Sequence, residues 1–213
     1  YDEVEEKGLF LFPEEEKKDA FEVLDREYTL NKLLTRELPL MVSNMFFKKS
    51  FFIEHGFQFD QGVILGADLM LVWRIILNLE KIGHLNKKLY NHFFRSDSLI
   101  TAPSSKKIET NLAGYRRTCD YVAKNYNKEF SKWIYARELY GLLSVVSVHG
   151  EYKMLRDNIS LYYTKEIHKS LQTFPDKRIV IMDKILYFCP WLFFQINKQL
   201  RQPNSWLFKL IHK

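Results

Sequence analysis

The second half of the chain contains five successive segments in which apolar residues recur at helical spacing, and this pattern most constrains the fold. The segments cover about 106–126, 128–148, 151–173, 176–200 and 203–212. Gly150, Pro175 and Pro203 fall between segments, where helix-breaking residues are expected. The sequence therefore predicts a helical C-terminal subdomain over residues 101–213.

The first hundred residues mix helical patterns with short alternating ones, which predicts an α+β fold that is mostly α with a few short strands. We expect helices over residues 14–34, 48–55 and 68–82, the last two ended by Gly56 and Gly83, and strands over residues 57–60 and 84–95. The polar segment from Ser96 to Ser105 is the best candidate for a boundary between domains at residues 1–100 and 101–213.

The amino-acid composition indicates a folded protein. A hydrophobic content of 46% supports a sizeable core. Cys119 and Cys189 match neither a disulfide framework nor a zinc site, so we expect buried, reduced thiols and a cytoplasmic location. No signal peptide or apolar run of about 18 residues is found, so neither secretion nor a membrane span is predicted.

Charge is distributed unevenly along the chain. The net charge is +6, yet residues 1–27 contain eleven acids and only four bases, so the basic excess lies in the remainder. Such an excess favours an anionic partner, either a phosphate-bearing substrate, lipid headgroups or nucleic acid. Nucleic acid is not expected, because no recognised motif or dense basic stripe is present.

One carboxylate, Asp68, stands at the start of an apolar helical pattern within the stretch Gly62–Trp73. An acid in a first turn accepts hydrogen bonds from free N–H groups and complements the helix dipole. A carboxylate held at a loop–helix junction beside an apolar wall can also serve as a general base. For Asp68 taken alone, both interpretations stay open.

Four phrases in order carry a resemblance. They are Phe59-Asp60-Gln61, Gly66-Ala67-Asp68, Leu89-Tyr90-Asn91-His92 and the segment from Arg95 to Ser98. In this order the chain resembles the C-terminal half of the GT-A catalytic domain of bacterial family 2 glycosyltransferases, of the capsule and exopolysaccharide type. The resemblance covers roughly residues 38–100 and rests on order and spacing. It implies an inverting hexosyltransferase in which Asp68 deprotonates the acceptor hydroxyl.

The resemblance also suggests other site residues. The first acid of the family's acidic pair is Ala67 here, which implies altered acceptor choice or reduced activity. Asp60 is expected either on the acceptor side or as a simple turn residue. His92 and Arg95 could approach the nucleotide diphosphate or its metal, although cross-strand packing is an equal expectation for His92. Ser98 could contact phosphate if its loop closes over the donor.

The nucleotide-binding half of such enzymes has no counterpart before Leu38, and no D-x-D motif occurs anywhere in the sequence. That motif holds the Mn²⁺ or Mg²⁺ that neutralises the leaving diphosphate, so no metal ligands are expected in this chain and the isolated chain should be inactive. The start at Tyr1 suggests a piece of a longer transferase that uses a nucleotide-sugar donor. The alternative is a non-catalytic helical module for interaction or membrane docking, with a vestigial transferase-like front.

The tail from residue 176 to residue 213 contains seven bases and two acids around an aromatic run. Basic residues beside a Trp- and Phe-rich face suit a helix at a membrane surface, as the use of a polyprenyl-phosphate-linked acceptor would require. Internal packing or a homodimer interface would explain the same aromatics. We therefore expect a cytoplasmic protein, with peripheral membrane attachment as one hypothesis.

Overall fold

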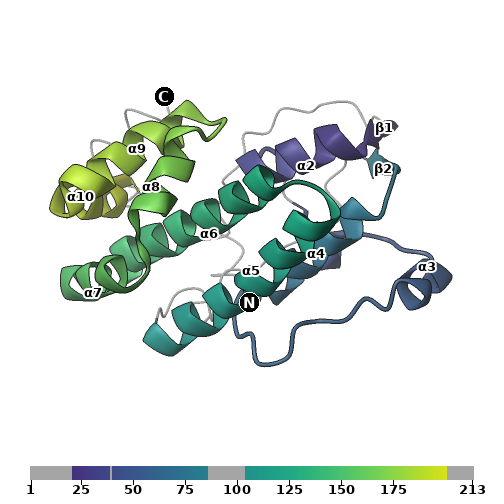
Figure 1. The fold of residues 1–213 in the computed structure, drawn as a ribbon, viewed down its shortest axis with the longest axis horizontal. Coiled ribbons are helices and arrows are strands. Elements are labelled where there is room, and N and C mark those ends of the chain that lie inside the picture. Colours follow the sequence, from purple (N-terminus) through teal and green to yellow (C-terminus); the bar gives the residue numbers. More distant parts are fainter. Residues whose placement is uncertain (1–20, 39, 86–103, 201–213) are drawn as a thin grey trace, which may run out of the picture.

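The computed structural model describes residues 21–38, 40–85 and 104–200, and within these ranges the protein is mostly helical with one two-stranded sheet (Figure 1). The prediction of a mostly α fold with short strands is thus confirmed. The described elements are β1 (Phe21–Asp25), α2 (Arg26–Thr35), a 3₁₀ turn (Val42–Asn44), α3 (Lys49–Glu54), α4 (Ala67–Leu77), β2 (Lys81–Leu85), α5 (Ser105–Asn125), α6 (Lys128–His149), α7 (Tyr152–Tyr162), α8 (Lys165–Gln172), α9 (Lys177–Phe188) and α10 (Pro190–Leu200).

Strands β1 and β2 pair antiparallel, with Phe21 opposite Leu85 and Asp25 opposite Lys81. The helix predicted over residues 14–34 is wrong for residues 21–25, which form β1. Helix α2 begins only after Asp25, whose carboxylate accepts a hydrogen bond from the Tyr28 N–H at 2.8 Å. The pairing of β1 with β2 brings α2 and α4 into contact.

Helix α4 ends at Leu77, earlier than the predicted Ile82, because Asn78 forms its C-cap and the chain then enters β2. The strand predicted over residues 57–60 is also wrong. No described strand lies beside it; instead Phe57 is buried among the rings of Phe51 and Phe52. Of the strand predicted over residues 84–95, His84 and Leu85 lie in β2 and the rest lies outside the described residues.

Helix α6 forms the centre of the molecule and contacts α5, α7, α8 and α10 (Figure 1). The boundaries of α5 and α6 agree with prediction, but two predicted long helices are each divided. Thr164 caps α8 and separates it from α7, and the non-helical backbone of Cys189 followed by Pro190 separates α9 from α10. The helix predicted over 203–212 lies outside the described residues.

The main core crosses the predicted domain boundary. One buried cluster joins Leu33 of α2 and Trp73 of α4 to Tyr115 of α5 and Ile134 of α6. A second cluster lies farther along α6, where α7, α9 and α10 pack. Described residues on both sides of the segment 96–105 therefore share one hydrophobic core.

Among the described helices, none combines the length and the hydrophobicity needed to cross a bilayer.

Candidate functional site

The loop that leads into α4 is fixed against α5 by backbone geometry and one side chain. Gly66 adopts φ 74°, a left-handed conformation that disfavours residues with a Cβ, and forms the N-cap of α4. The Asn111 amide donates a hydrogen bond to the Leu65 carbonyl at 2.8 Å. A Cβ on Gly66 would lie 2.9 Å from Asn111 Nδ2, so this close approach requires glycine. The start of α4 is thereby held at one position on α5.

Asp68 is the second residue of α4 and is partly exposed, whereas the residues that follow it on the helix are almost all buried. Arg36, just past the end of α2, lies near enough to interact with the Asp68 carboxylate and forms an ion pair with Glu138 of α6. Burial acts to lower the pKa of Arg36, but Glu138, Tyr115 and Asp68 together raise it above its ordinary value. The guanidinium is a permanent positive charge within electrostatic range of Asp68, and its direct partner is Glu138.

Helix α5, which packs against α4, carries a row of buried polar groups. Tyr115 is fully buried, and burial together with the Glu138 carboxylate raises its pKa well above the ordinary value. Asn111 Oδ1, the Tyr115 hydroxyl and Thr118 Oγ1 are buried without a direct hydrogen-bond partner in the described part of the chain. Their spacing places all three on one face of α5. The helix against which the start of α4 packs therefore carries buried polar groups, whereas the carboxylate of Asp68 is partly exposed.

Asp60 lies in the loop before α4, and its carboxylate binds one arginine of α4 and one of α5. Its carboxylate accepts hydrogen bonds from Arg74 Nη2 at 2.9 Å and from Arg117 Nε at 3.4 Å, and its side chain is mostly buried. Arg74 follows Asp68 by six positions, so its Cα lies about 9 Å farther along the axis of α4 than that of Asp68. Asp60 ties the loop to α4 and α5, and a role toward an acceptor stays a prediction.

The remaining predicted site residues divide into two groups. Ala67 is the first residue of α4 and lies beside Asp68, partly exposed. His92, Arg95 and Ser98 lie outside the described residues, so their expected contacts with a donor stay predictions.

Sequence reasoning missed Glu138 and its two neighbours Arg36 and Tyr115, both of which interact electrostatically with Asp68. Of these three residues, only Glu138 has a feature in the local sequence that could have identified it. It is an acid within the apolar pattern of α6, and a buried acid needs a partner. Arg36 has no such feature, since its contact with Glu138 spans 102 positions. The arrangement as a whole can remove a proton from a bound hydroxyl and can hold an anionic group near Arg36.

The described residues contain no group of three or more His, Cys, Asp or Glu side chains arranged to hold a metal ion. The resemblance implies that the ligands of a divalent metal lie in a nucleotide-binding half outside this chain.

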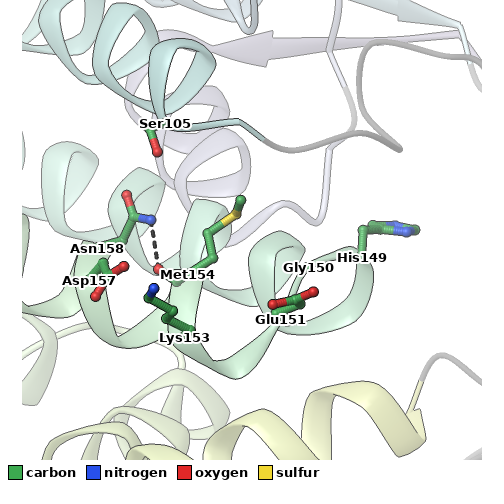
Figure 2. A pocket seen from close by; sticks show the side chains of 8 residues that line it. All are labelled: Ser105, His149, Gly150, Glu151, Lys153, Met154, Asp157 and Asn158. Atoms are coloured by element: carbon green, nitrogen blue, oxygen red, sulfur yellow. Dashed lines mark hydrogen bonds between the residues drawn. The ribbon is translucent and has the colours of Figure 1, made fainter.

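An open cavity of about 500 Å³ lies elsewhere, between the start of α5 and the junction of α6 with α7. Figure 2 shows Ser105 above the cavity and α7 residues such as Lys153 and Asp157 below it. The Asn158 amide donates back to the Met154 carbonyl of its own helix at 2.8 Å. None of the residues around Asp68 lines this cavity, so it does not extend the candidate site.

Comparison of the chain with protein-family models, with curated proteins and with solved structures found no match.

Proposed function

We propose that this chain is the acceptor-side part of an inverting glycosyltransferase that moves a sugar from a nucleotide-sugar donor to a glycan or lipid-linked acceptor in cell-surface polysaccharide synthesis. The proposal rests on the resemblance of the segment around Gly66-Ala67-Asp68 to family 2 transferases. The single observation that carries it is the partly exposed carboxylate of Asp68 in the first turn of an otherwise buried helix, within electrostatic range of Arg36.

In the proposed reaction, an acceptor hydroxyl attacks the anomeric carbon of the donor with inversion. The hydroxyl proton passes to the Asp68 carboxylate as the new C–O bond forms, and the nucleoside diphosphate leaves with the electron pair of the broken bond. A sugar hydroxyl is a poor nucleophile, so a positioned base typically contributes about 10²–10⁴ in rate. The rigid contact of Gly66 with α5 would keep that base in place.

The neighbouring residues have supporting roles in this proposal. Arg36 would attract the phosphate-bearing donor toward the site. Ala67 cannot accept a hydrogen bond from an acceptor sugar, so acceptor choice would depend on other groups. The donor and a divalent metal would be bound mainly by a nucleotide-binding half outside this chain, with His92, Arg95 and Ser98 as further candidates for donor contact.

The test is Asp68→Asn in the protein extended by its nucleotide-binding half. We expect kcat for sugar transfer to fall at least about 100-fold, with KM for the donor nearly unchanged, since the amide cannot take the proton. Asp120→Asn is the matched control, because Asp120 is an exposed acid on α5. Equal transfer rates for the Asp68→Asn variant and the unmodified protein would show that Asp68 is not the base.

A second candidate is a non-catalytic docking module whose transferase-like front is vestigial. The alanine at position 67 and the exposed aromatic residues at the junction of α9 and α10 favour it. In that case the extended protein would transfer no sugar, and Asp68→Asn would change neither binding nor stability. The two candidates therefore give different results in the same assay.

A further inference from the structure

The junction of α9 and α10 exposes large apolar side chains at one end of the molecule (Figure 1). Phe188 is 78% exposed and Trp191 is 54% exposed, and Tyr187 and Leu192 are also exposed beside them in sequence. We call these four residues the aromatic corner. The break at Cys189 and Pro190 turns the chain here, so the last residues of α9 and the first residues of α10 project at the turn instead of continuing one helix.

Ring contacts hold the aromatic corner in place. Tyr187 stacks on His168 of α8 with 3.9 Å between ring centroids, and Phe188 packs edge-on against Tyr187 at 5.1 Å. His168 is in turn held by the buried carboxylate of Asp183 at 2.6 Å. The exposed rings of Tyr187 and Phe188 are therefore preorganised, which lowers the entropic cost of placing them in an apolar medium.

Positive charge lies on the same face of α9. Lys177, Ile181, Lys184 and Phe188 follow one another at helical spacing, and all four are exposed. The acids of this segment do not offset the lysines. Asp183 is fully buried within a hydrogen-bond network, and Asp176 forms an ion pair with Arg178 at 2.8 Å. A basic, apolar helix face with aromatic residues at its end matches the chemistry of an interfacial membrane surface.

We propose that the aromatic corner, with Lys177 and Lys184, docks the protein on an anionic phospholipid surface. The rings would enter the boundary between headgroups and acyl chains, and the lysines would face the phosphates. A second copy of the chain fits less well, because a two-fold contact through this face would bring like charges together. The proposal does not depend on the transferase function.

Vesicle co-sedimentation of the full chain tests this proposal. We expect binding to vesicles of phosphatidylglycerol and phosphatidylcholine, weaker binding in high salt, and little binding to pure phosphatidylcholine. Phe188→Ala with Trp191→Ala should lower the vesicle-bound to free ratio by about tenfold or more, because two rings no longer leave water. Lys177→Gln with Lys184→Gln should weaken binding only to the anionic vesicles.

The matched control replaces two exposed aromatics at the opposite end of the molecule, near α3 (Figure 1). Phe46 is 98% exposed and Phe59 is 53% exposed, so Phe46→Ala with Phe59→Ala removes similar exposed surface and should leave vesicle binding unchanged. Circular dichroism spectra and melting curves check that each variant is folded.

Three results would overturn the proposal. The first is unchanged vesicle binding by the Phe188→Ala, Trp191→Ala variant while deletion of residues 201–213 abolishes binding. The second is equal binding of the unmodified chain to anionic and neutral vesicles. The third is a dimer in sedimentation velocity that the same double variant converts to monomer, with no vesicle binding, which would assign the corner to a second copy.

Discussion

The guanidinium of Arg36 pairs with the carboxylate of Glu138, although 102 positions separate the two residues in the chain. Arg36 adopts φ 63°, a conformation uncommon for a residue with a side chain, and its backbone N–H donates to carbonyls of the last turn of α2. The pair therefore joins the end of α2 to the middle of α6. This ion pair links α2, near the start of the described residues, to the central helix α6.

We predict that a double-mutant cycle of Arg36→Met and Glu138→Gln gives a coupling free energy of about 1–3 kcal/mol. Glu138 is buried, and loss of its partner leaves an uncompensated charge, while the side chain of Arg36 is 39% exposed and water screens part of the interaction. Urea unfolding of the four proteins measures the coupling. Additive single-variant effects would show that the two residues stabilise the fold independently.

Gly66 and Gly62 offer a matched pair of substitutions. Both have positive φ, 74° and 76°, but an added Cβ meets Asn111 at 2.9 Å only at position 66 and meets nothing within 4 Å at position 62. We expect Gly66→Ala to lower the free energy of unfolding by about 2–3 kcal/mol and Gly62→Ala by about 1 kcal/mol, as measured in urea. A larger loss for Gly62→Ala would contradict the contact with Asn111.

These contacts indicate which parts of the structure could be predicted from sequence. The boundaries of α5 and α6 were predictable because local signals mark them: Ser104 and Asn127 accept hydrogen bonds at the helix starts, and Gly150 ends α6. The position of Asp68 at the start of a buried helix was predictable for the same reason. Its glycine, its apolar run and its acid are all neighbours in the chain.

Contacts between distant residues could not be predicted in this way. The five residues of β1 were assigned to a helix, because only pairing with Lys81–Leu85 makes them a strand. Arg36 and Glu138 were missed since neither has a local motif. Cys189 was expected to be buried, but the turn before Pro190 leaves it exposed. Local spacing locates single elements, whereas the surroundings of Asp68 depend on tertiary packing.

Asp183 should be among the most costly residues to replace. Its fully buried carboxylate accepts hydrogen bonds from Tyr163, from His168 at 2.6 Å and from Gln172 at 2.6 Å, which joins α8 and α9 to the residue after α7. Asp183→Asn puts an N–H₂ group where donors converge, so we expect a loss of about 2–4 kcal/mol in urea unfolding.

Asp176→Asn is the control for Asp183→Asn. Asp176 caps α9 and pairs with Arg178, which is well exposed, and asparagine keeps the cap, so the expected loss is below about 1 kcal/mol. Equal losses for the two variants would mean that the buried network contributes no more than a surface pair.

The two cysteines should differ in reactivity. Cys189 is exposed, whereas Cys119 is buried, and burial with the nearby Glu138 and Asp120 carboxylates raises the pKa of the Cys119 thiol to about 12. Since the thiolate is the reactive form, we expect one fast reaction with a thiol reagent at pH 8 and a second only after unfolding. Cys189→Ser should remove the fast phase. Two fast phases in the native protein would show that Cys119 is accessible.

The same thiol should make stability depend on pH in the alkaline range. The folded-state pKa of Cys119, about 12, exceeds its ordinary value of 9.0, so the unfolded chain loses this proton first. The stabilisation is complete below about pH 9 and is lost as pH rises toward 12, with a slope of up to about 1.4 kcal/mol per pH unit.

Cys119→Ala should lower stability at pH 7 through the cavity it leaves, but it should flatten the decline between pH 9 and 11. Tyr126, whose pKa burial and Glu27 also raise to about 12, keeps part of the decline in both proteins. Urea unfolding at several pH values gives both slopes, and parallel curves for the two proteins would assign the alkaline sensitivity to residues other than Cys119.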